Sequence, residues 1–339
     1  MAGMTTIGTR KLGTTGPVVG ALGLGAMGMS DMYGPADETE SIATIHAALD
    51  SGLNLIDTAD FYGSGHNEML ISRALRGRRR EDVVLSVKFG SRKNPDGSFQ
   101  PVPYDVSASA VRDRLAQSLR RLETDYIDIY RPSRLNPDIP IEETVGALRD
   151  MQEAGYIRHI GLSEVGASTI RRAAAVAPIS DLQIEYSLLS RGPEQEIIPT
   201  LRELGIGLTA YGVLSRGLLS GQWTVNQELG ARDFRSALPR FSGDNLAANL
   251  RLVEELARVA ADLGATTSQV AIAWVAAQGA DVVPLVGARR RDRLAESLGA
   301  AELTLSPEVL ARIEAAVPAG AAAGGRYMDQ QLHLLDSER

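Results

Sequence analysis

The chain contains no cysteine and only four histidines among its 339 residues. Without cysteine there are no disulfides, no thiol catalysis and no zinc-thiolate sites, and the composition is typical of the reducing cytosol. No histidine pair has a metal-ligand spacing such as HxxxH, so we expect no catalytic metal. No apolar run reaches the ~20 residues of a membrane span, and no signal peptide is recognisable. We therefore expect a cytoplasmic protein with no membrane association.

Basic residues are outnumbered by acidic ones, 35 to 42, which gives a net charge of −7. This balance argues against nucleic acid as a partner, because phosphate binding requires a basic face. The hydrophobic content of 44% is that of an ordinary globular protein, and the length suits one α/β barrel or two smaller domains. No linker divides the chain, so we expect a single domain over residues 1–339, with 318–339 as a tail.

Short apolar runs recur along the chain and are predicted to be strands. Most are apolar on consecutive positions, which is typical of parallel strands buried on both faces. The eight runs are Ala21–Gly25, Leu53–Asp57, Val83–Lys88, Tyr126–Tyr130, Ile157–Ser163, Asp181–Glu185, Ile206–Tyr211 and Val282–Leu285.

Amphipathic segments lie between these runs and are predicted to be helices. They include Glu38–Ser51, Ser107–Leu122, Ile141–Ala154, Ala167–Ala177 and Glu194–Leu204. Glycines at 52, 155 and 205 follow helices where a left-handed cap belongs. The alternation predicts an α/β fold, a closed (β/α)8 TIM barrel. A doubly wound sheet is the alternative, but no GxGxxG stands at a strand-to-helix turn.

Two regions, Thr6–Val19 and Val213–Asp244, break the repeat. Thr6–Val19 carries turn signals and is predicted to form an N-terminal hairpin that plugs the barrel bottom. Val213–Asp244 is too long for a βα loop, so we expect a lid or a belt over a cofactor. Asn245–Gly264 and Thr266–Ala277 predict two helices before the last strand, and Pro318–Arg339 predicts a mobile or substrate-covering tail.

Three polar side chains stand at the ends of consecutive predicted strands, where a parallel barrel keeps its chemistry. Asp57 and Tyr62 follow one apolar run, and Lys88 closes the next. A Tyr held beside a Lys and an Asp is a candidate proton donor whose pKa of about 10 needs lowering. The alternative is a structural ion pair that merely hydrogen-bonds a tyrosine, because such pairs also perturb pKa values.

The order of motifs resembles that of the aldo-keto reductases from about Arg10 to Leu305. The matching stretches are Arg10–Gly13, Gly23–Gly25, Asp57–Gly63, Lys88, Asp125–Tyr130, Gly161–Ser163, Gln183–Ser187, Arg216–Gly221 and Val283–Gly287. The resemblance implies a barrel that binds NADPH and moves hydride to or from a carbonyl carbon. In such an enzyme Tyr62 is the general acid, Lys88 stabilises its phenolate and Asp57 holds Lys88.

The resemblance also implies residues for the cofactor. Tyr186 is expected to stack on the nicotinamide, and Ser163 and Gln183 to bond its carboxamide, although Glu164 replaces the Asn common in the family. The pyrophosphate is expected on the backbone of a loop, and the adenosine 2′-phosphate on two arginines after the last strand, which favours NADPH over NADH. The remaining expected cofactor residues are Leu214, Arg216, Leu218 and Ser220 in that loop, Arg289 and Arg293 for the 2′-phosphate, and Tyr211, Gly287 and Ser297.

The substrate is expected to meet mostly apolar side chains, which favours an aromatic or aliphatic carbonyl or alcohol. The candidate residues are Met27, Phe61, Phe89 and Tyr327, together with Arg131 as a hypothetical group that polarises the substrate oxygen. His66, four residues after Tyr62, is a weaker candidate for a catalytic base.

The family's fourth catalytic group is usually a His, and Ser133 occupies that position here. A serine can donate a hydrogen bond but cannot carry a positive charge. Three consequences remain open: slower carbonyl reduction by Tyr62; an unusual reaction such as alcohol oxidation or reduction of a conjugated double bond; or NADPH binding with little turnover, as in the potassium-channel beta subunits of the family. A Schiff-base aldolase using Lys88 is a further alternative, disfavoured by the Asp partner.

Overall fold

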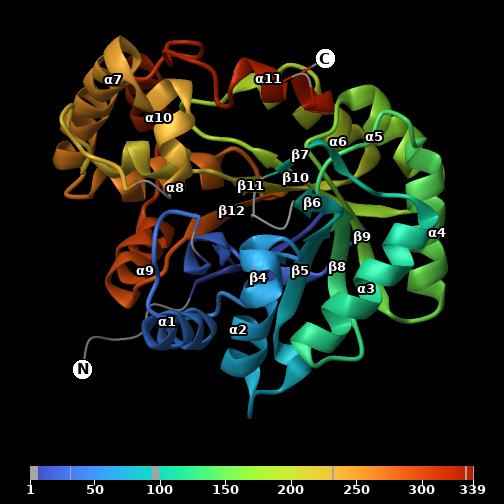
Figure 1. The fold of residues 1–339 in the computed structure, drawn as a ribbon. Coiled ribbons are helices and arrows are strands. Elements are labelled where there is room, and N and C mark those ends of the chain that lie inside the picture. Colours follow the sequence, from blue (N-terminus) through green and yellow to red (C-terminus); the bar gives the residue numbers. More distant parts are fainter. Residues whose placement is uncertain (1–6, 31, 94–98, 231–232, 333, 339) are drawn as a thin grey trace.

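The computed structural model describes residues 7–30, 32–93, 99–230, 233–332 and 334–338. Within this part of the chain, eight parallel strands close into a barrel in the order β10-β11-β12-β3-β4-β5-β8-β9 (Figure 1). The strands are β3 Gly23–Gly25, β4 Leu55–Ala59, β5 Val84–Phe89, β8 Ile127–Pro132, β9 Ile157–Ser163, β10 Ile179–Glu185, β11 Gly207–Tyr211 and β12 Val282–Gly287. The predicted (β/α)8 barrel is confirmed.

One helix follows each barrel strand on the outside of the barrel (Figure 1). These helices are α1 Glu38–Asp50, α2 His66–Leu75, α3 Ala108–Leu122, α4 Ile141–Glu153, α5 Ala167–Ala174, α6 Ile197–Leu204, α8 Thr267–Ala277 and α9 Arg291–Leu298. The sequence did not mark α2, because Asn67, Glu68 and Ser72 are buried on it and interrupt its apolar periodicity.

The N-terminal hairpin pairs β1 Thr9–Lys11 with β2 Val18–Gly20 in antiparallel register. Leu12 and Val19 are fully buried and pack on inward-facing side chains at the amino ends of the strands, among them Leu55, Val84 and Ile129. The hairpin therefore closes the bottom of the barrel, as predicted from residue 7 onward; Thr6 lies outside the described residues.

Several elements are additions to the repeat. They are the hairpin β6 Ser91–Lys93 and β7 Phe99–Tyr104, which was not predicted, the helix α7 Gly243–Asp262, and the C-terminal helices α10 Pro307–Ala316 and α11 Asp329–Leu332. Helices α7 and α10 pack on each other, and the chain then returns toward β10 and β11 (Figure 1). This return brings the C-terminal tail back to the carboxyl ends of the strands.

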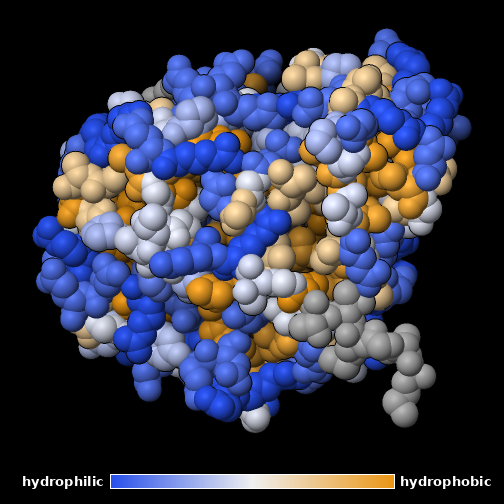
Figure 2. Space-filling model, turned by 180° about the vertical axis from the view of Figure 1, so that it is seen from behind, coloured by the Kyte–Doolittle hydropathy of each residue, from blue (hydrophilic) through white to orange (hydrophobic). Residues whose placement is uncertain are grey.

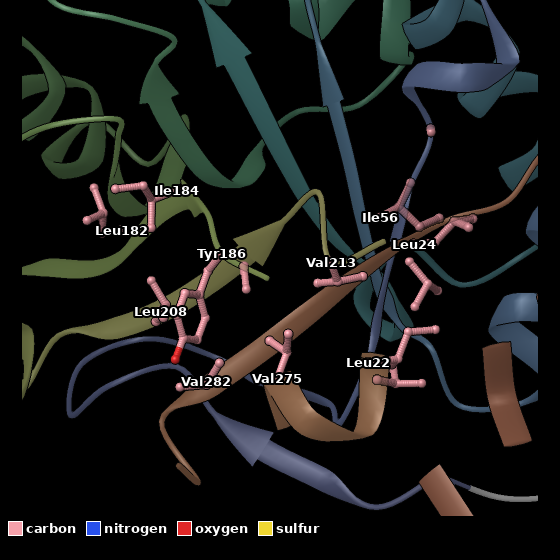
Figure 3. Packing of buried hydrophobic residues seen from close by; sticks show 14 of the residues in the cluster. Leu22, Leu24, Ile56, Leu182, Ile184, Tyr186, Leu208, Val213, Val275 and Val282 are labelled. Atoms are coloured by element: carbon pink, nitrogen blue, oxygen red, sulfur yellow. The ribbon is translucent and has the colours of Figure 1, made fainter. Parts of the chain in front are cut away.

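Alternation along the strands separates two apolar layers. Outward-facing side chains such as Leu182, Ile184 and Leu208 pack beneath the helices (Figure 3). Inward-facing side chains form the smaller apolar layer on the N-terminal hairpin. Above that layer the inward positions are polar yet buried: Ser86, Lys88, Arg131, Asp181, Gln183 and Thr209.

The outer surface is mainly hydrophilic, with apolar side chains in smaller areas, on the face shown in Figure 2. The large exposed hydrophobic side chains Val18, Met69, Tyr156 and Val225 come from separate segments. In the described part of the chain, no helix combines the length and apolarity needed to cross a bilayer.

Candidate active site

Asp57 and Lys88 form a buried ion pair at the carboxyl end of the barrel, with each side chain only 5% exposed. They lie on adjacent strands, because Asp57 on β4 pairs with Ser86 on β5, two residues before Lys88. The second carboxylate oxygen of Asp57 accepts hydrogen bonds from Gln183 Nε2 at 2.6 Å and from Ser86 Oγ at 2.9 Å. Asp57 is therefore held from three sides and fixes the ammonium of Lys88 in turn.

Tyr62 lies directly above this pair and is only 6% exposed. Lys88 Nζ is 5.1 Å from the centre of its ring. The ring is set by the turn η2 Tyr62–Gly65, in which Gly63, Ser64 and Gly65 all have positive φ. The structure brings together Asp57, Tyr62 and Lys88, as the strand-end positions predicted.

The pKa values of this group differ from the expected pattern. Burial, with Asp57 adding to it, raises the pKa of Tyr62 well above 10, and the charge of Arg134 opposes the shift only in part. Burial also lowers the pKa of Lys88, against the effect of Asp57. The expected lowering of the Tyr62 pKa is not seen, because the loss of solvation outweighs the nearby cations. Tyr62 is consequently a neutral phenol.

Ser133 reaches the same end of the barrel and is 1% exposed. Its N–H donates to the Phe89 carbonyl at 2.8 Å, while its hydroxyl has no hydrogen-bond partner among the described residues. A buried hydroxyl without a partner is uncommon in folded proteins and indicates a position where a ligand can bind.

The neighbouring Arg134 was not selected by the sequence reasoning, although it lies beside the altered position. Its Nη1 donates to the Ser133 carbonyl at 2.6 Å, with Ser163 Oγ at 3.4 Å, and its Nη2 donates to Tyr327 Oη at 3.1 Å. The only sequence signal was its place directly after Ser133.

Arg131 lies deeper than expected for a substrate-binding group. Its Nη1 is 2.9 Å from Asp181 Oδ2, and its Nη2 donates to Ser86 Oγ at 3.1 Å. Both members of the ion pair are completely buried. Its guanidinium therefore lies inside the barrel, and Arg131 is the register partner of Lys88 on the neighbouring strand.

The C-terminal tail forms one side of the site. Glu164, which has φ of 53° at the end of β9, accepts from Arg326 at 2.5 and 2.9 Å and from Tyr211 Oη at 2.6 Å. The Tyr211 and Tyr327 hydroxyls are 2.9 Å apart. Arg326 holds the pKa of Glu164 well below its usual range, against the effect of burial. The resemblance places an Asn at this position, where it would contact the nicotinamide carboxamide. Here the side chain of Glu164 is instead engaged in an ion pair with the tail.

Two aromatic residues face the helices instead of the site. Tyr186 packs among outward-facing residues (Figure 3). It also packs against Trp274, and its hydroxyl donates to Glu194 at 2.7 Å. Phe89 is fully buried and stacks on Tyr130 with ring centres 4.5 Å apart. Both residues were expected at the site, and strand alternation explains why they are not there. Gln183 faces inward, so Tyr186, three residues later, faces outward. Lys88 faces inward, so the next residue, Phe89, faces outward.

The remaining apolar candidates do lie near Tyr62 or at the same strand ends. The ring of Phe61 meets that of Tyr62 edge-on at 4.9 Å. Met27 begins the turn η1 Met27–Met29 directly after β3 and is partly buried. His66 instead hydrogen-bonds Ser30 Oγ at 2.9 Å and approaches Glu38, on the outer side of the turn.

The expected phosphate residues gather around the start of α9. Arg289 donates to the carbonyls of residues 33, 34 and 35, and no described carboxylate pairs with it. Arg293 contacts Glu296 at 3.1 Å and Gln222 at 2.7 Å. Gly287 leaves open space where a Cβ would stand, whereas the Ser297 hydroxyl bonds back to the Arg293 carbonyl.

The loop after β11 crosses toward the loop after β3. Its turn η5 Ser215–Ser220 includes Leu214 as its cap and contains Arg216, which has φ of 58° and pairs with Glu185 at 3.2 Å. Leu218 is buried, and Ser220 Oγ accepts from the Gln222 N–H. Farther on, Tyr33 and Asp233 form a β-bridge and Tyr33 contacts Phe234. The expected belt therefore spans from β11 to the β3 loop.

No group of His, Cys, Asp and Glu suited to a metal ion is present in the residues that the structure describes. The site consists instead of a buried phenol, a lysine–aspartate pair and several arginines, which can transfer protons and bind anionic or carbonyl oxygens.

Comparisons with known proteins agree with this arrangement. The family model for the aldo/keto reductase family matches residues 21–318. A probable aldo-keto reductase 1 of Glycine max is 42% identical over 327 residues, covering 96% of this chain and 93% of that protein.

Two solved structures are also similar. A glycerol dehydrogenase from Gluconobacter oxydans is 28% identical with a TM-score of 0.82, covering 93% of this chain and 95% of that one. The holo form of an aldo-keto reductase from Bacillus halodurans is 30% identical with a TM-score of 0.76, covering 93% and 97%. The barrel, the strand-end triad and these similarities together establish that the chain belongs to the aldo-keto reductase family and is an NAD(P)H-dependent oxidoreductase.

Proposed function

We propose that the protein interconverts a carbonyl and an alcohol with NADPH as the cofactor and with Tyr62 as the general acid and base. The observation that carries this proposal is the buried Asp57–Lys88 pair directly beneath a neutral Tyr62. The phenol is neutral in the resting site, and the Lys88 cation beside its ring is the group that can stabilise the phenolate left by proton transfer.

The residues present fit a nicotinamide cofactor. Tyr211 ends β11 at the barrel mouth, so we assign to its ring the stacking role first expected of Tyr186. The open space at Gly287 and the unpaired charge of Arg289 near the start of α9 suit the phosphate end. When bound, the reduced nicotinamide supplies the hydride that adds to the carbonyl carbon, and is itself oxidised.

Each member of the cluster has a separate task. Tyr62 gives its proton to the carbonyl oxygen, and Lys88 stabilises the phenolate that remains. Asp57 fixes Lys88, and Gln183 fixes Asp57 through its amide nitrogen, which leaves the amide oxygen free to accept from the carboxamide. Ser163 supplies a second polar group at the end of β9. In the alcohol-to-carbonyl direction Tyr62 accepts the proton.

Ser133 changes the balance at the substrate oxygen. Its free hydroxyl can donate one neutral hydrogen bond, which stabilises a developing alkoxide less than a charged donor does. We therefore expect turnover that is slower than a histidine in this position would support, but not absent.

A Tyr62→Phe variant tests the proposal. NADPH absorbance is followed with a panel of aldehydes and ketones, and with alcohols and NADP+, while cofactor binding is measured by fluorescence. We expect Tyr62→Phe to lose about 100-fold or more in kcat and to keep its cofactor affinity. Tyr130→Phe is the matched control. It also removes a buried phenol hydroxyl, one that has no partner among the described residues, but from a ring that faces the helices and stacks on Phe89.

The outcomes separate the alternatives that Ser133 leaves open. If Tyr62→Phe reduces carbonyls as fast as the wild type, the assigned acid is incorrect. Tight NADPH binding with no turnover of any carbonyl, alcohol or conjugated alkene would favour the regulatory role. Covalent trapping of substrate on Lys88 by borohydride would favour the aldolase.

A further inference from the structure

We propose that the substrate carries a carboxylate in addition to its reacting carbonyl, and that Arg134, with the Ser133 hydroxyl beside it, binds that carboxylate. The inference rests on the proposed function and deepens it, because it names the substrate class of the same site.

The argument begins with the charges at the barrel mouth. Four of its five cations have carboxylate partners: Lys88 has Asp57, Arg216 and Arg240 share Glu185, and Arg326 has Glu164. Arg134 is the exception among the described residues. Its three hydrogen bonds go to a backbone carbonyl and to the hydroxyls of Ser163 and Tyr327, all of them neutral.

The charge of Glu164 acts on Arg134 from nearby, but no described carboxylate contacts its guanidinium. A carboxylate is the group that this planar fork fits. Arg134 is only partly exposed and lies between Ser133, Ser163 and Tyr327. The hydroxyls beside it can add hydrogen bonds to an anion. The hydroxyl of Ser133, the preceding residue, is buried and has no hydrogen-bond partner in the described part of the chain, so it is available to a ligand.

The same guanidinium lies within the electrostatic field of the reacting groups. Burial raises the pKa of Tyr62 and lowers that of Lys88, and the charge of Arg134 acts on both. An anion on Arg134 would therefore lie within electrostatic range of the carbonyl that Tyr62 protonates. The ring of Phe61 contacts that of Tyr62, so the site fits a compact oxo acid with an apolar body.

The experiment uses a substrate pair that differs in charge and hardly in shape: 4-carboxybenzaldehyde and its methyl ester. Steady-state kinetics with NADPH compare the wild type with Arg134→Gln and with Arg134→Lys. Arg171→Gln is the control, because that arginine pairs with Glu203 on the exposed surface. We expect the wild type to prefer the carboxylate in kcat/KM by about 10- to 100-fold, the worth of hydrogen bonds to a charged group.

Arg134→Gln should abolish that preference mainly through KM, with a loss for the carboxylate that is much larger than the change in the ester reaction, while Arg134→Lys keeps part of the preference. A wild type that prefers the ester, or an Arg134→Gln variant that slows both substrates equally, would overturn the proposal. If Arg134→Gln does not fold, retention of the preference by the Lys variant supports the proposal and its complete loss counts against it.

Binding of benzoate to the NADP+ complex, measured by calorimetry, separates this proposal from the reaction itself. Benzoate binding that Arg134→Gln removes supports the anion site even if neither aldehyde is reduced, in which case only the proposed function fails. Failure of the wild-type complex to bind benzoate contradicts the anion site, whatever the enzyme reduces.

Discussion

Arg131 and Asp181 form a completely buried ion pair across the inside of the barrel, with Nη1 2.9 Å from Oδ2. Ser86 joins this pair to the site above, because its hydroxyl accepts from Arg131 and donates to Asp57. Gly161 leaves the necessary room: a Cβ there would lie 2.9 Å from the guanidinium carbon of Arg131. The side chains that support the triad from inside the barrel are thus polar.

Replacing Arg131 with Met should destabilise the protein strongly. The change leaves Asp181 as an uncompensated buried charge, which costs about 3–5 kcal/mol in the free energy of unfolding. Chemical denaturation measures this loss. The double variant Arg131→Met/Asp181→Leu removes both charges and should recover much of it; a double variant as unstable as the single one would show that the pair itself stabilises the fold.

The free energy of unfolding should depend on Asp60, which sits two residues before Tyr62. Burial raises the pKa of Asp60 from 3.8 to about 6, with Arg114 opposing the shift. Between these two pH values the native state binds more protons than the unfolded state, so stability falls as the pH rises. The size of the shift corresponds to about 3 kcal/mol.

Asp60→Asn cannot titrate, so its stability relative to the wild type should increase between pH 3.8 and pH 7. Denaturant unfolding across that range measures the difference. Asp50→Asn removes a half-exposed carboxylate paired with Arg78 and serves as the control. A difference that stays flat with pH would mean that Asp60 is ionised at ordinary carboxylate pH values.

Ser133→Ala should affect catalysis more than stability. The hydroxyl has no protein partner, so its removal should change the melting temperature little. If the hydroxyl donates to the substrate oxygen or to an anion, kcat/KM should fall by about 2- to 10-fold. Thermal unfolding and steady-state kinetics together test this, and unchanged kinetics would remove Ser133 from the site.

Glu164→Gln should release the C-terminal tail. The variant leaves Arg326 with only Glu338 at 2.7 Å and Glu185 at 3.7 Å as carboxylate partners, so the cost should approach but stay below the about 3–5 kcal/mol of an unpaired buried charge. Limited proteolysis or hydrogen exchange of residues 324–338 measures the release. Glu203→Gln breaks an exposed pair with Arg171 and should cost at most about 1 kcal/mol. Equal protection in the two variants would argue against the Glu164 contact as the main support.

Arg289→Met and Arg293→Met should weaken NADPH binding by about 10- to 100-fold each and leave NADH binding almost unchanged. The reason is the loss of a charged hydrogen bond to the 2′-phosphate, which NADH lacks. Fluorescence titration of both cofactors tests the pair. Arg290→Met is the control, because Arg290 pairs with Asp292 on the surface. Equal losses for both cofactors would place the 2′-phosphate elsewhere.

Much of the fold follows from local sequence patterns. Mostly apolar runs such as Val83–Lys88 marked the eight barrel strands, because strands buried on both faces tolerate few polar side chains. Asp57, Tyr62 and Lys88 were found for a related reason: chemistry in a parallel barrel lies at the carboxyl ends of strands, and those ends can be read from the sequence.

Only the tertiary structure decided which side chains share a space. The inward or outward direction of a strand residue depends on register, so Tyr186 and Phe89 turned out to face the helices while Tyr211 faces the mouth. The pairing of Glu164 with Arg326 joins positions 162 residues apart, and no local sequence pattern predicts it. Likewise, Arg134 becomes distinctive only once every neighbouring cation is seen to have a carboxylate partner, because charge compensation is a property of the folded neighbourhood.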